Sequence, residues 1–266
     1  MNFAMLRRAL KDLRSTVAWY AGGLAILMFV MMGFYPTVRA NAAEFQRMLA
    51  AYPKAFMEAF GVTDFTTPAG FIGAEVLSVM WPLTAAIFII LTGAATVALE
   101  VERGTIDLWL SVPERRWRLL LAKVAALLIG IVLISATTLA ALVLGAVWVG
   151  ERFTPSGLLA TGIVTTSFGI AIGGYAVLCS SFSGDRGKAA GLAAAVTLAF
   201  YMASIISGLS ERWSWLERFT IFTAYQPQRA LEAGQVPLLG TAALLAIGVA
   251  GVAGAAAIFE RRSIVA

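Results

Sequence analysis

Uncharged, mostly apolar runs recur along the chain and set its predicted architecture. There are six such runs of 21–26 residues each, and they cover residues 15–35, 76–99, 124–149, 158–182, 189–210 and 238–259. A helix needs about 20 apolar residues to cross the hydrocarbon core of a bilayer. The runs show no alternation of period two, so they predict helices and not the strands of a membrane barrel. We therefore expect an all-α membrane protein with six transmembrane helices, in a single transmembrane domain over residues 1–266.

The first 17 residues carry a second pattern. Phe3, Leu6, Leu10, Leu13 and Val17 recur at spacings of three and four, which places them on one helical face flanked by basic residues. This pattern favours an amphipathic elbow helix that lies in the membrane surface. The alternative is a plain basic flank that only orients the first span. A cleaved signal is disfavoured, because the apolar region of a signal is only about 7–15 residues long.

Lys and Arg are distributed unevenly between the two sets of connecting segments. With the N-terminus placed in the cytoplasm, 13 of the 20 basic residues fall in four short inner segments and seven fall in the outer loops. This bias follows the positive-inside rule, so we expect both termini in the cytoplasm. The net charge of +5 is then an orientation signal, and it gives no reason to expect nucleic-acid binding. Arg outnumbers Lys 16 to 4, which suggests a GC-rich bacterium. With six spans, the chain is expected to be a multi-pass protein of the bacterial cell (inner) membrane.

Composition excludes several kinds of chemistry. The chain is 60% hydrophobic and 13% charged, and it contains no histidine and one cysteine, Cys179. Histidine-dependent nucleophiles, histidine-ligated metals and an internal disulfide are therefore impossible within this chain. The four aspartates are scattered, which argues against a metal-dependent membrane transferase. We expect no catalytic residue, no metal site and no cofactor bound by this chain.

No nucleotide-binding domain is predicted either. The connecting segments are too short, and the segment from Gly184 to Ala189 only partly resembles a phosphate-binding loop. Phe182 stands where that loop has its first glycine, and Ala189 stands where it has Ser or Thr. We interpret this segment as a basic cytoplasmic turn.

The loop after the second run combines charge with a short amphipathic pattern. Gly104 and Thr105 form a break with a potential N-cap, and Trp109 belongs to an i, i+3, i+4 apolar stripe. Pro113 ends the pattern, and acidic residues surround it. These features favour a docking surface for a soluble partner. The alternative is a solvated anchoring loop, which would need neither the acids nor the tryptophan.

This loop and the layout of six short-looped spans resemble the type-2 ABC-transporter permease family. The matching positions are Glu100, Glu102, Gly104, Thr105, Leu108, Leu110, Ser111, Pro113, Arg116 and Lys123. In that family the N-terminal stretch is an elbow helix at the membrane surface. The loop between spans two and three is a coupling helix that is seated in a groove of the ATPase subunit. Two permeases and two ATPases form the transporter, and most members export.

The resemblance implies a permease subunit of an ATP-driven exporter that is not itself an enzyme. Its implied partners are two copies of a cytoplasmic ABC ATPase, which bind ATP and magnesium, and a second permease in a homodimer or heterodimer. The ATPase-coupling interface is expected at Glu100, Glu102, Arg103, Gly104, Thr105, Asp107, Trp109, Ser111, Pro113 and Arg116. The inner halves of the spans carry no charge, which favours a hydrophobic or amphiphilic substrate. An ion-gradient-driven secondary transporter and a non-transporting membrane assembly factor are the alternatives.

Candidates for the substrate path or the outer gate are Glu75, Phe56, Phe60 and Tyr175. Phe56 and Phe60 share the apolar face of an amphipathic pattern in the long first outer loop, which is either a lid or a helix resting on lipid. Glu75 lies near the outer end of span two, where it lines the exit path, pairs with Arg212 or Arg218, or rests at the head-group level.

Two further patterns concern packing and the last outer loop. Gly169-x-x-x-Gly173 in span four and three glycines at every third place in span six (Gly248, Gly251 and Gly254) predict close helix packing within the bundle. The loop over residues 211–237 is rich in aromatic residues, which favour the head-group level. A re-entrant hairpin is the alternative for this loop.

Overall fold

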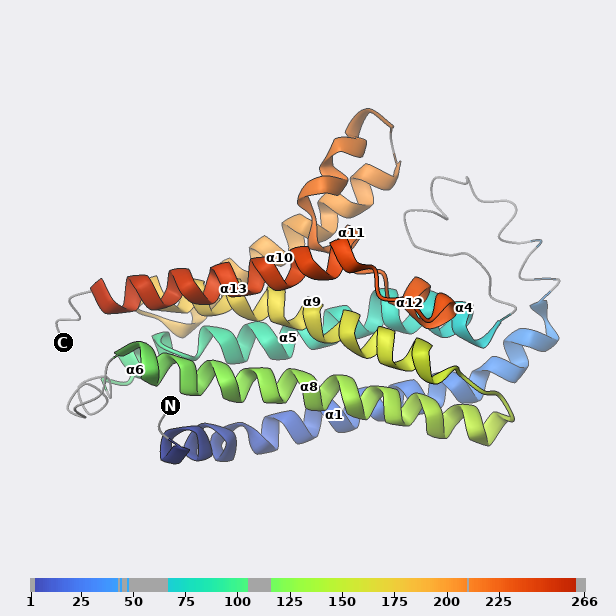
Figure 1. Ribbon diagram of the computed structural model, residues 1–266, viewed down its shortest axis with the longest axis horizontal. Helices are drawn as coiled ribbons and strands as arrows, with labels where there is room; N and C mark the ends of the chain where they lie inside the picture. The colour runs from blue at the N-terminus through green and yellow to red at the C-terminus, as the bar shows by residue number, and fades with distance from the viewer. Residues whose placement is uncertain are drawn as a thin grey trace.

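The structure is a computed structural model that describes residues 3–42, 44, 47, 67–104, 116–209 and 211–261 (Figure 1). Nearly all of these residues are helical, and no strand occurs among them. Six helical segments are long and apolar enough to cross a membrane, which confirms the predicted all-α membrane fold. These segments are Ala4–Ala40, Pro68–Ala94, Trp117–Val149, Pro155–Phe182, Arg186–Leu209 and Leu238–Arg261.

Five of the six spans are single helices. These helices are α1 (Phe3–Ala40), α8 (Arg116–Val149), α9 (Pro155–Phe182), α10 (Arg186–Leu209) and α13 (Leu238–Arg261). The second span is built in sequence from α4 (Pro68–Ile72), the π-helix η1 (Gly73–Met80) and α5 (Trp81–Ala94). Four short helices complete the described part, namely α6 (Ala98–Glu102), the 3₁₀ helix η2 (Glu211–Phe219), α11 (Ile221–Ala224) and α12 (Pro227–Ala233).

The second span differs in position from the uncharged run over residues 76–99. Its helix begins at Pro68, after Thr67, whose hydroxyl accepts a hydrogen bond from the amide of Gly70 at 3.0 Å. Proline in the first turn and a capping threonine are both typical of a helix start. Glu75 therefore lies within the helical segment, where its side chain is exposed on η1. A search for uncharged runs misses this helix start, because the Glu75 carboxylate interrupts the run.

Helix α9 is the centre of the bundle. It is the most buried of the six spans, since 72% of its most apolar 18-residue stretch lies inside the molecule. It packs against α5, α8, α10, α12 and α13. The glycine stripe of α13 lies directly against it, since a Cβ added at Gly174 would fall 2.4 Å from the carbonyl oxygen of Gly248. Gly169 of α9 instead faces Ile131 of α8. The glycine stripe of α13 therefore packs against α9, whereas Gly169 packs against α8. The predicted close packing within the bundle is confirmed.

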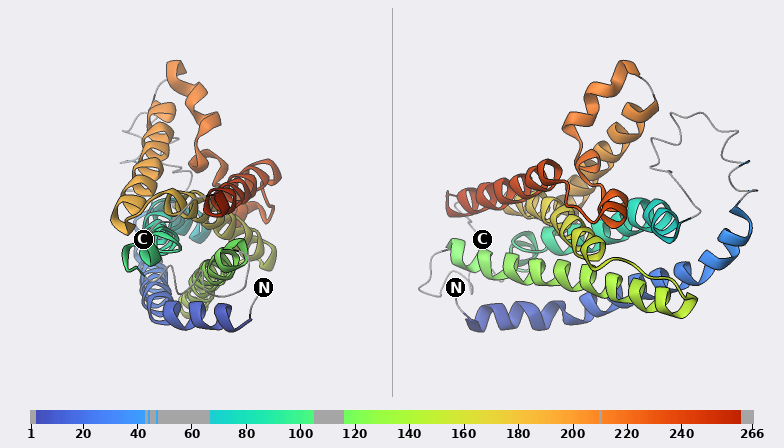
Figure 2. Two further views of the ribbon diagram at one scale, coloured as in Figure 1. Left: turned by 90° about the vertical axis from the view of Figure 1, so that its left-hand side faces the viewer. Right: turned by 45° about the vertical axis from the view of Figure 1, so that its right-hand side comes forward.

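The two ends of the bundle differ. One end, here called the α6 end, contains the start of α1, helix α6, the starts of α8 and α10, and the end of α13 (Figure 1). Viewed from this end, the first turns of α1 run across the bundle before the helix turns along it (Figure 2, left). The other end, called here the α12 end, contains α12 and α4, and α10 and η2 project to one side of the bundle between the two ends (Figures 1 and 2). The elbow role of the first turns and a cytoplasmic location of the α6 end stay predictions.

The last connecting segment has two parts with different surroundings. Trp213, Trp215 and Phe219 on η2 are exposed, as residues at the head-group level would be. Tyr225, which follows α11, is buried and stacks on Phe168 of α9 with ring centroids 4.3 Å apart. The chain between spans five and six therefore folds back into the bundle after η2.

Candidate functional site

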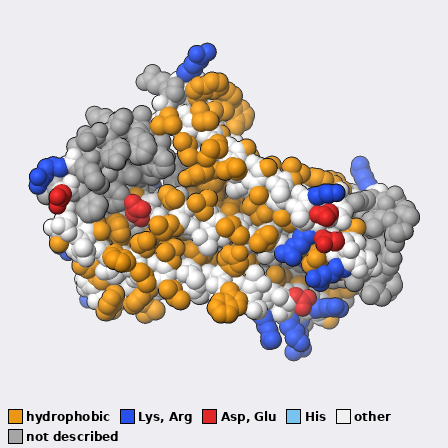
Figure 3. Space-filling view, turned by 180° about the vertical axis from the view of Figure 1, so that it is seen from behind, with side chains coloured by type: hydrophobic (Ala, Val, Ile, Leu, Met, Phe, Trp, Pro, Cys, Tyr) orange, Lys and Arg blue, Asp and Glu red, His pale blue; other side chains and the backbone are white. Residues whose placement is uncertain are grey.

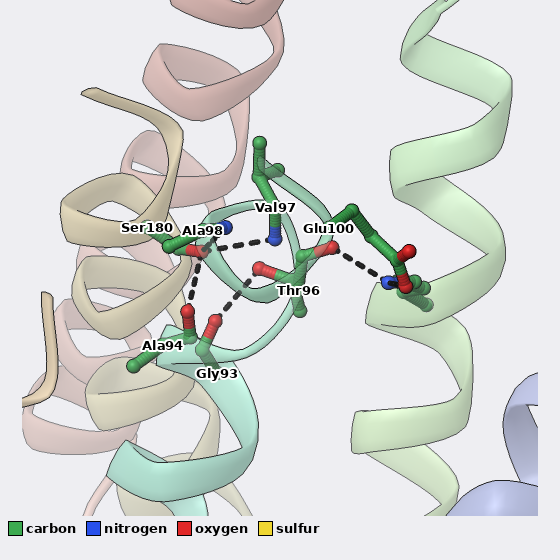
Figure 4. A network of polar contacts seen from close by, with 8 residues as sticks. Gly93, Ala94, Thr96, Val97, Ala98, Glu100 and Ser180 are labelled. Atoms are coloured by element: carbon green, nitrogen blue, oxygen red, sulfur yellow. Dashed lines mark hydrogen bonds and ion pairs between the residues drawn. The ribbon is translucent and has the colours of Figure 1, made fainter. Parts of the chain in front are cut away.

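The corner between α5 and α6 is held by a side chain from α9. The Ser180 hydroxyl accepts hydrogen bonds from the backbone N–H groups of Val97 and Ala98, each at 2.9 Å (Figure 4). It also donates to the carbonyl oxygen of Ala94, the last residue of α5, at 2.7 Å. The first N–H groups of a helix have no partner within it, so Ser180 caps α6 from a distant span. Ser180 is fully buried, which removes water as an alternative partner.

A second link joins this corner to α8. The Lys123 ammonium group donates to the backbone oxygen of Thr96 at 2.9 Å and to the Glu100 carboxylate at 2.7 Å. Both charged side chains are largely shielded, with 16% and 17% of their surfaces exposed. The pair also explains why the sequence can place a lysine so close to an apolar run, since a charge at this depth requires a partner.

A third link joins α6 to α10. The carboxylate of Glu102, the last residue of α6, accepts a hydrogen bond from the backbone N–H of Arg186 at 3.0 Å. Arg186 is the first residue of α10, and the neighbouring Asp185 carboxylate accepts from the amide of Lys188 at 2.7 Å. Both acids therefore satisfy free N–H groups at the start of α10, where negative charge is favoured.

The chain leaves α6 through a left-handed turn. Arg103 is exposed and follows α6, and Gly104 has a φ of +64°, a conformation that glycine adopts without the steric cost of a side chain. The next predicted interface residues, which are Thr105, Asp107, Trp109, Ser111 and Pro113, lie outside the described residues. Arg116 begins α8, and its side chain also lies outside the described part.

Helix α6 is thus connected to three spans by named polar contacts. Two of the side chains involved, Glu100 and Glu102, are predicted site residues, and the structure brings them together on one short helix. Ser180 is a functional candidate that the sequence does not single out. Its only signal is a serine near the end of an apolar run, and many spans contain such serines.

Comparison with known families identifies the chain. The family model described as ABC-2 family transporter protein matches residues 9–234. The chain belongs to the ABC-2 transporter family. A search of curated proteins finds no match.

Membership in the ABC-2 family confirms the predicted resemblance and makes the chain the membrane permease of an ABC transporter. An ABC-2 permease is a membrane transport subunit and not itself an ATPase. Its partners are accordingly an ABC ATPase and the lipids of the membrane in which its six apolar helices lie. The corner at α6 is the described part of this permease that leads into the loop over residues 105–115.

Of the four candidates for a substrate path, Glu75 and Tyr175 belong to the described residues, and they lie on different elements with different surroundings. Glu75 is exposed on η1, and it forms an ion pair with neither Arg212 nor Arg218, although all three belong to the described residues. Tyr175 is buried, and its hydroxyl lies 2.6 Å from that of Thr197, so it joins α9 to α10. Phe56 and Phe60 lie outside the described residues.

Proposed function

We propose that this chain is the permease subunit of an ATP-driven exporter, and that it moves a hydrophobic or amphiphilic substrate outward by alternating access. Two copies of a separate ABC ATPase bind ATP and magnesium and dock at the α6 end, which faces the cytoplasm. A second permease, in the simplest case a second copy of this chain, completes the transporter. The segment over residues 100–116 is the coupling element, and the first turns of α1 form an elbow helix at the membrane surface.

The observation that carries this proposal is the fastening of α6 to three spans. Ser180 connects it to α9, Lys123 to α8 and the Glu102 carboxylate to α10, through contacts of 2.7–3.0 Å. A force applied to the adjoining loop therefore reaches three membrane helices through short polar contacts. Such a connection lets nucleotide binding on a partner bias two arrangements of a helix bundle.

The polar groups of the spans support an apolar or amphiphilic substrate. The hydroxyls of Thr137, Thr138 and Thr165 donate to backbone oxygens of their own helices at 2.8–2.9 Å. Threonine commonly makes this bond in helices, and it leaves the hydroxyl with less capacity for a polar substrate. The positive-inside bias and the basic first turns of α1 support a cytoplasmic α6 end.

Reversal of the Glu102 charge tests the coupling role. Glu102→Lys removes the acceptor at the start of α10 and places a positive charge beside the helix dipole, which opposes it. We expect the variant to fold and to bind the ATPase, while ATP hydrolysis no longer drives transport. Glu260→Lys is the matched control, because it is an exposed acid in the last turn of α13 at the same end of the bundle.

The measurement uses the permease co-purified with its ATPase and reconstituted into inverted vesicles. ATP-dependent uptake of a panel of lipophilic dyes reports transport, and phosphate release reports ATPase activity. The proposal predicts uptake in the wild type and in Glu260→Lys, and hydrolysis without uptake in Glu102→Lys. Normal uptake by Glu102→Lys would refute the coupling role. Uptake driven by an ion gradient without ATP would favour a secondary transporter, and absence of an associated ATPase would favour an assembly factor.

A further inference from the structure

A cavity of about 580 Å³ opens at the α6 end between four parts of the chain. Its walls come from the first turns of α1, from the end of α5 with the α6 corner, and from α8 and the start of α10. It is separate from the hydrogen bonds of Ser180 described above, because Ser180 does not line it. The cavity brings the N-terminal helix within reach of the same segment that leads into the coupling loop.

The lining of this cavity changes from apolar to charged along the bundle. Leu13 and Tyr20 of α1, with Leu91 of α5, supply part of its apolar wall. Arg8 and Arg186 lie at its charged part, close to the α6 end. Twelve residues separate Arg8 from Tyr20 along α1, which is about 18 Å of helix at 1.5 Å per residue. A ligand that fits both parts has an anionic group at one end and an apolar chain of comparable length.

The charge of the lining is positive. Four basic and two acidic side chains line the cavity, and one basic and one acidic member of this set, Lys123 and Glu100, pair with each other. Asp12 is the other acid, against three arginines. Neither the Arg8 nor the Arg186 guanidinium group forms an ion pair with a described residue. Figure 3 shows Lys, Arg, Asp and Glu side chains gathered at this end of a face that is otherwise largely hydrophobic.

We propose that this cavity binds one anionic phospholipid from the membrane leaflet at the α6 end. The guanidinium groups of Arg8 and Arg186 contact the lipid phosphate, and an acyl chain lies along Leu13, Tyr20 and Leu91. Arginine suits this role because its planar fork can donate two parallel hydrogen bonds to a phosphate. Basic pockets between membrane helices are also known to bind anionic head groups. The proposal concerns a resident lipid, and it holds whatever substrate the permease transports.

An anionic phospholipid fits better than a soluble phosphate. The apolar wall formed by Leu13, Tyr20, Phe88 and Leu91 would be left against water by a soluble anion. A bound phospholipid covers that wall with its chain and places its phosphate among the arginines. Because the cavity joins α1 to the α6 corner, such a lipid would also hold the N-terminal helix against the coupling segment.

The test compares two double variants of the full-length chain that lose equal charge. Arg8→Gln with Arg186→Gln removes both proposed phosphate contacts. Arg7→Gln with Lys188→Gln is the control, since both residues are exposed close neighbours that do not line the cavity. Non-specific attraction of anionic lipid falls equally in the two double variants, so any difference between them reports the cavity itself.

Lipid binding is measured by native mass spectrometry of the detergent-solubilised protein, titrated with dioleoylphosphatidylglycerol or dioleoylphosphatidylcholine. We expect the wild type and the control to retain one phosphatidylglycerol in preference to phosphatidylcholine. The Arg8, Arg186 double variant should bind phosphatidylglycerol about tenfold more weakly, as expected for the loss of charge-assisted hydrogen bonds. Glycerol phosphate at the same concentration should not displace the lipid.

Three results would overturn the proposal. Equal weakening in both double variants would show attraction by bulk charge alone, and equal retention of the two lipids would show that the head group is not recognised. Displacement by glycerol phosphate would identify a soluble phosphate ligand. Thermal unfolding of each variant without added lipid checks its fold. If the double variant does not fold, the single variants Arg186→Gln and Lys188→Gln make the same comparison.

Discussion

Replacement of Ser180 by alanine isolates the link between α9 and the α6 corner. The substitution removes a single hydroxyl that accepts from the amides of Val97 and Ala98 and donates to the carbonyl of Ala94. Ser180 and all three partner residues are buried, so water does not readily replace the lost contacts. The volume change is small, which means that the effect reports hydrogen bonding and not packing.

The expected cost follows from the groups left without partners. A buried donor or acceptor that loses its hydrogen bond costs about 1–3 kcal/mol. Two N–H groups lose their acceptor in Ser180→Ala, and they share one oxygen, so we expect a loss of about 2–4 kcal/mol in the free energy of unfolding. Ser207→Ala is the matched control, because the buried Ser207 hydroxyl bonds, among the residues that the structure describes, only to the carbonyl of Ser204 in its own helix. For the control we expect a loss below about 1 kcal/mol.

The assay is equilibrium unfolding of the detergent-solubilised protein, followed by circular dichroism. A parallel measurement of ATP-dependent transport by the reconstituted complex shows whether the loosened corner also weakens coupling. If Ser180→Ala is no less stable than Ser207→Ala, the hydroxyl does not hold the corner and the reasoning fails. If stability falls but transport per ATP is unchanged, Ser180 is structural and carries no coupling role.

Two further substitutions test packing and the folded-back segment. Gly174→Ala would place a Cβ 2.4 Å from the backbone of α13. We therefore expect a lower melting temperature and a loss of about 1–3 kcal/mol in the free energy of unfolding. The control Gly191→Ala adds its Cβ in open space on α10 and should leave stability unchanged or raise it. Equal melting temperatures for these two variants would contradict the close packing of α9 on α13. Tyr225→Phe removes a 2.8 Å hydrogen bond to the carbonyl of Leu77 and should lower the free energy of unfolding by about 1 kcal/mol. The control Tyr201→Phe loses no such bond within the described residues and should leave the free energy of unfolding unchanged. Burial raises the pKa of Tyr225 well above its ordinary value, because the folded state favours the neutral phenol. The stability that neutral Tyr225 contributes is therefore present below about pH 10 and is lost as the pH rises further. Melting curves that fall equally between pH 9 and 11 in the wild type and in Tyr225→Phe would show that this group does not contribute.

The sequence determines the number of spans and their approximate position because the bilayer imposes a fixed length on apolar helices. It also predicts close packing of span six through its glycine stripe, since only small residues allow backbones to approach so closely. The family resemblance rests on a local motif around Glu100 and Pro113 together with the six-span layout, and both are properties of the linear chain. The matching family model confirms that inference.

Only the tertiary structure decides which distant residues meet. Ser180 lies more than 80 positions from the amides that it caps, and no local pattern distinguishes it from the serines that bond to their own helix. The folding back of Tyr225 into the bundle is also decided by packing against Phe168, because an aromatic residue suits both a head-group layer and a helical core. The cavity beside Arg8 arises from four segments that converge at the α6 end. The sequence alone predicts a basic amphipathic helix there and does not indicate which segments pack beside it.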